Sequence, residues 1–490
     1  MNRRQFLANT AASAVALAFS GRAAATAAHE GHAVPDGAAV PSELMPDTAI
    51  PGGMPLRPLV RLPNRSRRSG LFRARLVAAP TVVEMVPGVK TAAWAYNDSL
   101  PGPLIDATEG DIVEILFINR LPSATTVHWH GLPVPPDQDG NPSDPVPPGA
   151  ERLYRFTLPE GSAGTYWYHP HPHGSTPEQV FRGLAGTFIV RSRHDPLAHL
   201  PEQHLVISDL RLARNGAIPD NTELDWMNGR EGQYVLINGQ REPEIRVRGR
   251  QRWRVWNACS ARYLRLSLGG RPFWLVGTDG GLIGAARRMT ELLLAPGERA
   301  EWIVDAPDTE TKLIALAYDR QKMGDVGPER DIVIATVKGV SGDAGAIPDT
   351  LRPVPALGEP ASRKRVQFSE TMSMENGRHE MKFLVNGKTF DMARIDLVSR
   401  RGRIEEWDIV NASHMDHPFH LHGTQFQVVE RVRGGRAVPE PFLAWRDTVN
   451  LAPEETVRIR VVQAFAGIRM FHCHILEHEG QGMMGQLRVE

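Results

Sequence analysis

The residues with the richest chemistry in this chain are histidines gathered in four short segments. The sequence has 18 histidines and only two cysteines, Cys259 and Cys473. Neutral imidazole, thiolate and thioether groups are ligands that suit copper. A single His-X-His pair is weak support for a metal site, but four clusters beside aromatic, Gly or Pro residues predict one. The segments are 128–131 (HWHG), 169–174 (HPHPHG), 417–423 (HPFHLHG) and 472–474 (HCH), the last followed by His478 and Met483.

The last segment is suited to join two metal sites. If it forms a strand, its two histidines face one way and Cys473 faces the other. Glycines farther along let the chain turn back towards Cys473. A cysteine, two histidines and a weak axial methionine are the ligands of a blue-copper electron-transfer site. The sequence offers this set as Cys473, His478, Met483 and, from the preceding segment, His417.

The remaining histidines predict a second, larger metal site. Histidines at positions i and i+2 of a strand share a face, so each pair approaches one cluster from one side. Structural zinc is the competing interpretation, but zinc sites use four ligands in a compact set, and the histidines here exceed that number. The eight candidates for the second site are His128, His130, His169, His171, His420, His422, His472 and His474.

Strands must position these segments, and the sequence has the pattern of strands. Apolar and polar residues alternate over 111–119, which predicts a half-buried strand. Recurring phrases lie roughly 140 to 155 residues apart, a spacing of duplicated domains rather than of a solenoid. With 490 residues, 45 glycines and 39 prolines, we predict an all-β chain of three Greek-key β-sandwich or barrel domains. The phrases are Asn-Gly at 238–239 and 386–387, and a proline turn at 146–149, 294–297 and 451–454.

Changes in composition predict the domain boundaries. The N-terminus has the order of a twin-arginine export signal, with Arg3 and Arg4 before an apolar run and small residues. A flexible segment rich in Pro, Gly and Ala follows it, in which His29 and His32 are expected to be solvated. The predicted units are 1–28 (signal), 29–70 (flexible segment), 71–192, 200–338 and 363–490 (domains), and 339–362 (linker).

Charge and hydropathy exclude several kinds of partner. Lys+Arg and Asp+Glu are both 56, so the formal net charge is zero, which argues against nucleic acid. No stretch approaches about 18 uninterrupted apolar residues, which predicts no membrane span. Exported proteins often form disulfides, but Cys473 is assigned to a metal. Cys259 is therefore predicted to be a buried thiol.

Together and in this order, the four segments resemble the motifs of the multicopper oxidase family, in particular three-domain bacterial laccases and copper-efflux oxidases. The resemblance covers nearly all of the chain after the export signal. It implies three cupredoxin-like domains, which match the repeats. It also implies a blue (type 1) copper in the third domain and a three-copper cluster between the first and third domains.

The resemblance implies ligands for four copper ions, and no ligand position is substituted. One branch of the family, exported by the same route, has lost its copper ligands and serves as a cell-division scaffold, so the complete set separates this chain from it. His173 is not a ligand position and is interpreted as a supporting or structural residue. The implied ligands are His417, Cys473, His478 and axial Met483 for type 1; His128 and His420 for type 2; and His130, His169, His171, His422, His472 and His474 for the type 3 pair.

Two carboxylates beside the motifs are candidates for proton delivery. Reduction of O2 to water consumes four protons, so a buried cluster needs a relay. Asp139 follows the first motif where related oxidases keep a carboxylate near the cluster, and Glu479 resembles a second such residue. The alternative is that both are surface carboxylates in loops. The candidate catalytic residues are Cys473, His472 and His474 for electrons and Asp139 and Glu479 for protons.

The expected function is that of a laccase-like oxidase, periplasmic or secreted and monomeric. It takes single electrons from a phenol, an aromatic amine or a metal ion and reduces O2 to water. Substrate is expected to dock against the exposed edge of His417 or His478. A copper nitrite reductase, a copper chaperone or electron carrier, and a scaffold are the less favoured alternatives.

A cuprous oxidase for copper tolerance is the principal alternative. Met415 matches a position that copper-efflux oxidases use for substrate copper, but Ser413 stands where those enzymes carry an aspartate. Met372, Met374 and Met381 form only a loose group, not a methionine-rich segment. The sequence therefore favours the laccase-like function over dedicated oxidation of cuprous ions.

Overall fold

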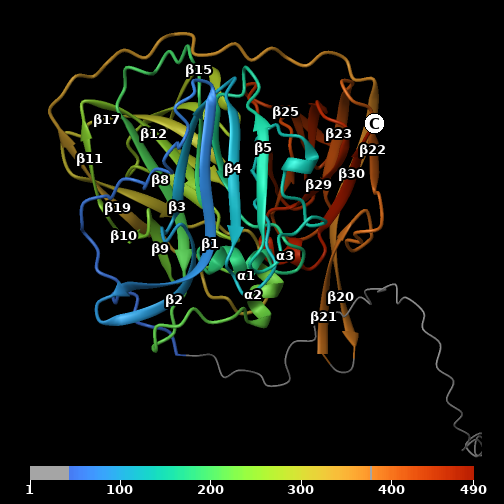
Figure 1. Ribbon diagram of the computed structural model, residues 1–490, viewed down its shortest axis with the longest axis horizontal. Helices are drawn as coiled ribbons and strands as arrows, with labels where there is room; N and C mark the ends of the chain where they lie inside the picture. The colour runs from blue at the N-terminus through green and yellow to red at the C-terminus, as the bar shows by residue number, and fades with distance from the viewer. Residues whose placement is uncertain (1–42, 376–377) are drawn as a thin grey trace, which may run out of the picture. The chain divides into compact units, whose positions relative to one another are not determined.

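The computed structural model describes residues 43–375 and 378–490 (Figure 1). The predictions for the export signal, His29 and His32 lie outside these residues. Strands account for 48% of the chain and helices for 5%, which confirms the all-β prediction. In the described part of the chain, no helix has the length and apolar character needed to cross a membrane.

Six sheets arise from three consecutive stretches of sequence, two sheets from each. The strands of the first stretch are β1 (Leu71–Val86), β2 (Val89–Tyr96), β3 (Gly102–Thr108), β4 (Ile112–Asn119), β5 (Glu151–Thr157), β6 (Gly164–Tyr168) and β7 (Gly186–Arg191). They form a four-stranded sheet in the order β2-β1-β4-β5 and a three-stranded sheet in the order β3-β7-β6.

The second stretch forms a seven-stranded sheet and a five-stranded sheet. Its strands are β8 (Glu202–Leu210), β9 (Tyr234–Ile237), β10 (Gln240–Arg241), β11 (Glu244–Arg248), β12 (Arg250–Asn257), β13 (Leu264–Ser267), β14 (Phe273–Thr278), β15 (Gly281–Met289), β16 (Glu291–Leu294), β17 (Arg299–Asp305), β18 (Thr311–Leu316) and β19 (Ile332–Val340). The orders are β10-β9-β8-β12-β17-β14-β15 and β11-β19-β18-β13-β16.

The third stretch repeats the arrangement of two sheets. Its strands are β20 (Ser362–Glu375), β21 (Arg378–Val385), β22 (Leu397–Ser399), β23 (Ile404–Asn411), β24 (His417–Leu421), β25 (Phe426–Arg433), β26 (Arg436–Pro439), β27 (Thr448–Leu451), β28 (Thr456–Val462), β29 (Gly467–Cys473) and β30 (Met484–Val489). The orders are β21-β20-β23-β28-β25-β26 and β22-β30-β29-β24-β27.

Alternating burial explains why these segments form sheets around separate cores. In β4, Val113, Ile115 and Phe117 are fully buried while the residues between them are partly exposed, as the period of two over 111–119 predicted.

Residues 341–361 contain neither helix nor strand. We propose that the first, middle and third domains have the boundaries predicted from the sequence, 71–192, 200–338 and 363–490. Their cores include, respectively, Trp129, Trp302 and Trp407.

Three short α-helices, one from each domain, gather at one end of the sheets (Figure 1). They are α1 (Thr176–Phe181), α2 (Glu223–Asn228) and α3 (Leu476–Gly480). Both α1 and α2 pack against α3. A capping box between Thr222 and Asp225 satisfies backbone donors at the start of α2. Because α3 carries His478 and Glu479, these contacts fix that part of the candidate site relative to all three domains.

Residues 43–62 belong to the segment over 29–70 that is predicted to be flexible. Residues 43–62 lie along the first and middle domains. An extended chain has free backbone donors, which pair with carbonyl groups at sheet edges and loops. The N–H groups donate from Met45 to Leu212 (3.0 Å), from Leu56 to Glu244 (2.9 Å) and from Leu62 to Leu104 (2.8 Å).

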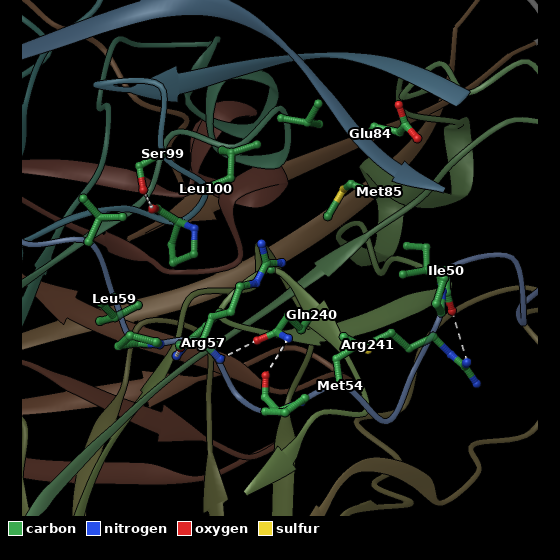
Figure 2. A pocket seen from close by; sticks show the side chains of 18 of the residues that line it. Ile50, Met54, Arg57, Leu59, Glu84, Met85, Ser99, Leu100, Gln240 and Arg241 are labelled. Atoms are coloured by element: carbon green, nitrogen blue, oxygen red, sulfur yellow. Dashed lines mark hydrogen bonds between the residues drawn. The ribbon is translucent and has the colours of Figure 1, made fainter. Parts of the chain in front are cut away.

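A cavity of about 640 Å³ lies between this segment and the first and middle domains (Figure 2). Met54 and Arg57 line it from the segment, Met85 from β1 and Gln240 from β10. The backbone N–H of Arg57 donates to the side-chain oxygen of Gln240 at 2.7 Å. None of the described residues that line the cavity is a histidine or a cysteine, so it is separate from the four histidine segments.

Candidate metal centre

The four histidine segments meet as two antiparallel pairs. His128 and His169 form an antiparallel bridge, in which the N–H of His128 donates to the carbonyl of His169 at 2.8 Å. In the third domain, β24 pairs with β29 and places His420 opposite His472. Cys473 comes next along β29 and so points to the other face. Backbone pairing therefore assembles each half of the site before any metal is considered.

The predicted blue-copper ligands converge on Cys473. His417 Nδ1 lies 3.4 Å and His478 Nδ1 lies 4.0 Å from the Cys473 sulfur. The two Nδ1 atoms are 3.3 Å apart. Met483 is fully buried, and its carbonyl accepts the backbone N–H of Cys473 at 3.0 Å. The structure therefore brings the two imidazoles and the sulfur together. It also holds the backbone of Met483 next to that of Cys473.

Burial keeps these groups neutral until a cation binds. It lowers the pKa of His417 to about 3 and raises the pKa of the Cys473 thiol. A metal cation supplies the positive charge that a buried thiolate needs, and its binding releases the thiol proton. The set of one sulfur and two imidazoles therefore fits a copper ion.

The expectation that substrate reaches an exposed edge of His417 or His478 is wrong, because both side chains are fully buried. The Phe383 ring stacks on His478 with 3.9 Å between centroids, and His478 Nε2 pairs with the Met227 carbonyl at 3.2 Å. His417 Nε2 lies 4.0 Å from Glu370 Oε2. A reductant must therefore contact these covering residues rather than the ligands.

The other eight histidines form one fully buried cluster. Nε2 atoms lie 3.3 Å apart for His128 and His420, and 3.1 Å apart for His171 and His472. Ring nitrogens of seven of them, all except those of His474, fall into groups in which all atoms lie within 4.8 Å of one another. Three such groups contain only histidines: His128 with His420 and His422, His128 with His130 and His169, and His171 with His422 and His472.

Burial keeps these imidazoles in the neutral form that binds metal ions. Burial, reinforced by neighbouring histidines, lowers the pKa of His169, His171 and His422 well below the usual value, so these rings are neutral. Neither ring nitrogen of His474 has a hydrogen-bond partner among the described residues. Buried polar atoms rarely lack partners. Metal ions between the rings would satisfy the facing nitrogens, so the cluster fits the copper ions that the resemblance implies.

Comparison with known proteins decides the family. Models of the multicopper oxidase family match residues 78–195 and 360–490, the two parts that carry the histidine segments. The multicopper oxidase mco of Staphylococcus aureus is 32% identical over 440 residues, which cover 87% of this chain and 91% of that protein. This chain belongs to the multicopper oxidase family. The oxidase is therefore an oxidoreductase of a copper-dependent family.

The oxidase is also similar to three further proteins. A multicopper oxidase from Campylobacter jejuni, a metallo-oxidase of known structure, has a TM-score of 0.90 and 45% identity and covers 92% of this chain and 98% of its own. That similarity confirms the three cupredoxin-like domains. Laccase of Bacillus subtilis (strain 168) is 29% identical over 469 residues (81% of this chain, 91% of that protein). Cell division protein FtsP of Photorhabdus laumondii is 30% identical over 416 residues (81% and 85%).

Asp139 lies inside the histidine cluster of the oxidase rather than on the surface. Its side chain is fully buried, with Oδ2 3.1 Å from His422 Nδ1 and Oδ1 3.2 Å from His128 Nδ1. Its carbonyl also lies 3.0 Å from His128 Nδ1. Burial raises the pKa of Asp139, against the opposing effects of His128 and Arg469. The carboxyl is thus placed to hold a proton beside two cluster histidines.

Glu479 is also fully buried, so the surface alternative is wrong for both carboxylates. Its Oε1 lies 4.0 Å from His171 Nδ1, too far for a direct hydrogen bond. Burial raises the pKa of Glu479 to about 8, against a smaller opposing effect of Thr176. His173 lies outside the cluster: it is exposed, and its ring centroid is 4.9 Å from that of Phe390.

Asp447 is a site residue that the sequence analysis missed. Its Oδ1 lies 3.0 Å from His130 Nε2, and it forms a further possible ligand group with His130 and His420. In the sequence it is a single aspartate just before β27, with no histidine near it and no motif spacing. Only the pairing of β27 with β24, which places Thr448 opposite His420, brings it to the cluster.

Proposed function

We propose that the oxidase couples the one-electron oxidation of a small reductant to the four-electron reduction of O2 to water. The tripeptide 472–474 carries this proposal. The Cys473 sulfur lies 3.4 Å from His417, while Nε2 of the adjacent His472 lies 3.0 Å from His422. A short covalent path therefore joins the two ligand sets, as transfer of single electrons from one site to the other requires.

The copper content and its ligands are part of the proposal. Copper, when bound, supplies the one-electron redox chemistry, and the protein supplies geometry and exclusion of water. Four copper ions would be held: type 1 by His417, Cys473, His478 and Met483; type 2 by His128 and His420; and the type 3 pair by His130, His169, His171, His422, His472 and His474.

Buried carboxyl groups would deliver the protons. Each O2 takes up four electrons and four protons to give two water molecules. Asp139 Oδ2 lies 3.1 Å from His422 Nδ1, and Glu479 Oε1 faces His171 Nδ1 at 4.0 Å. Both side chains are fully buried. They would therefore exchange protons with the histidine cluster without opening the cluster to bulk solvent.

Export and assembly complete the proposed setting. The arginines Arg3 and Arg4 support export by the twin-arginine route to the periplasm or the medium. Both halves of the histidine cluster come from this one chain, which supports a working monomer. A copper nitrite reductase, by comparison, builds its catalytic copper site between subunits.

The copper-loaded oxidase is expected to hold about four copper ions per chain and to consume one O2 for every four electrons donated by a phenol. Metal analysis and an oxygen electrode measure both, and added catalase should return no O2 because the product is water. A copper content near one per chain would favour a carrier. Reduction of nitrite with O2 excluded would favour a nitrite reductase, and failure to bind copper would favour a scaffold.

For the reductant, we propose a laccase-like range of phenols, aromatic amines and metal ions. The similarity to Laccase of Bacillus subtilis supports this range. Met415, which the sequence analysis connected with cuprous ions, is fully buried, and Ser413 beside it donates to the Asn411 side chain at 2.6 Å. These positions therefore give no support to a dedicated cuprous site.

Oxidation of cuprous ions is the second candidate, and a methionine pair on the β20–β21 hairpin favours it. Met372 lies directly opposite Met381, and 51% of Met372 is exposed. Thioethers are soft ligands that suit cuprous copper. Two residues before Met372, Glu370 contacts His414 and lies 4.0 Å from His417 Nε2. One face of the hairpin therefore leads from solvent to a blue-copper ligand.

Replacing both Met372 and Met381 by leucine separates the two candidates. If cuprous ions enter along the hairpin, kcat/KM for them is expected to fall about tenfold, the equivalent of about 1.4 kcal/mol, with phenol oxidation unchanged. Met392→Leu is the matched control, since Met392 is an exposed methionine of the same domain. Equal rates in all variants would remove the second candidate, whereas phenol turnover that depends strongly on added copper would support it.

A further inference from the structure

The middle domain contributes no histidine to the four segments, yet two of its residues reach the histidine cluster. Arg299 is the first residue of β17, and Asp279 directly follows β14. Both are buried, with relative exposures of 2% and 0%. Charged side chains are almost never this buried unless they are paired. The residues paired with Arg299 and Asp279 therefore indicate the role of these two side chains.

The guanidinium group of Arg299 forms a bidentate ion pair with the carboxylate of Asp447. Its two terminal nitrogens lie 2.7 and 2.5 Å from the two carboxylate oxygens of Asp447. Its Nε donates to the carbonyl of Thr165 in the first domain at 2.9 Å. A planar two-point contact of this kind fixes the plane as well as the position of a carboxylate. Arg299 therefore joins all three domains at one point.

Asp447 in turn orients two cluster histidines. Its Oδ1 lies 3.0 Å from His130 Nε2, and its carbonyl lies 2.9 Å from His420 Nδ1. A carboxylate paired with arginine and a carbonyl only accept hydrogen bonds, so His130 carries its proton on Nε2 and His420 carries its proton on Nδ1. His130 is thus left to bind through Nδ1 and His420 through Nε2.

Asp279 holds the main chain at the same place. Its carboxylate accepts the backbone N–H groups of Asp447 at 3.2 Å and of Thr448 at 3.3 Å, and it also accepts the N–H of Arg299 at 2.8 Å. Arg299 fixes the carboxylate of Asp447 and Asp279 fixes its backbone. The middle domain therefore controls both atoms of Asp447 that face histidines.

The tightness of this arrangement explains a glycine in the first motif. Gly131 follows His130 and has a φ of 83°, which favours glycine. A Cβ atom there would lie 2.1 Å from Asp447 Oδ2 and 2.6 Å from an Arg299 nitrogen. The ion pair therefore packs directly against the backbone that carries a ligand, with no room for adjustment.

We propose that Arg299 is a positioning residue: by holding the carboxylate of Asp447, it fixes which ring nitrogen His130 turns towards the metal, while Asp279 holds the backbone whose carbonyl does the same for His420. The copper-free middle domain is thus a working part of the three-copper centre. This inference rests on the proposed function, because it concerns the same cluster. Residues that orient metal-binding histidines typically contribute roughly 10–100-fold to metal affinity or activity.

Arg299→Lys tests the proposal, because lysine keeps the charge and loses the two-point contact. We expect this variant to keep its blue-site copper and to lose cluster copper to a chelator at roughly 10–100-fold lower chelator concentration than the parent protein. The control is Arg252→Lys. Arg252 is an equally buried arginine of the same domain, and its partners Glu301 and Asp195 contact none of the described ligand histidines.

Melting of the copper-free proteins distinguishes positioning from general stability. Arg299→Lys should melt no lower than Arg252→Lys and yet be the only one of the two to lose cluster copper. Equal copper loss in both variants, or parent-like retention in Arg299→Lys, would overturn the proposal. Should Arg299→Lys not fold, Thr448→Val decides, because the Thr448 hydroxyl lies 3.1 Å from ring nitrogens of both His130 and His420 and its loss should weaken cluster copper in the same direction. A parent protein that binds four copper ions without reducing O2 would refute the proposed function and leave this inference standing.

Discussion

Replacing Cys473 by serine is expected to abolish the blue absorption and the oxidase turnover together while the chain remains folded. Serine has nearly the same shape, but its hydroxyl oxygen is a hard, weakly acidic ligand that does not replace a thiolate. The sulfur lies 3.4 Å from the Nδ1 atom of His417 and 4.0 Å from the Nδ1 atom of His478. Its loss would remove the proposed blue site and interrupt the short covalent path to His472 and His474.

The measurements are visible absorption, copper content and O2 uptake on the copper-loaded protein. The control is Cys259→Ser, since Cys259 is the other buried cysteine and its sulfur lies in the middle domain, 3.8 Å from the Ile207 carbonyl oxygen. That variant should stay blue and active. A Cys473→Ser protein that remains blue and turns over would refute the assignment of the electron-transfer site.

Replacing Asp139 by asparagine should slow turnover roughly 10²–10⁴-fold, the range for loss of a positioned proton donor. Asparagine keeps the shape of the carboxyl group between His128 and His422 but cannot exchange a proton. Because burial raises the pKa of Asp139, the native group is suited to accept and return one. The blue site lies in a separate ligand set, so its reduction by substrate should keep its normal rate.

Stopped-flow absorption separates the two half-reactions. We expect unchanged loss of blue colour when excess reductant is mixed with the variant under anaerobic conditions, and a much slower return of colour when O2 is then added. Asp137→Asn is the matched control, because Asp137 is an exposed aspartate two residues earlier, in the 3-10 helix Pro136–Gln138. Parent-like reoxidation of Asp139→Asn would show that the relay runs elsewhere, and Glu479→Gln would then be the variant to measure.

The sequence by itself determined the fold class and named the candidate ligands. The reason is that both are written in local patterns: alternation of apolar residues predicts strands, and a His-X-His pair in a strand necessarily shares one face. The four histidine segments together, with this alternation, predicted two metal sites. Comparison with relatives then established the family and did not alter the fold class.

Only the tertiary structure decided what surrounds those ligands. Glu370, Phe383 and Met227 cover His417 and His478, the histidines proposed to bind the blue copper, which were expected to present an exposed edge to substrate. Arg299 meets Asp447 across 148 positions of sequence. Each is an ordinary charged residue beside an ordinary strand, and the free energy of burying either one becomes favourable only when the other is present. The two residues of this ion pair lie in different domains, so no short stretch of the sequence predicts the pairing.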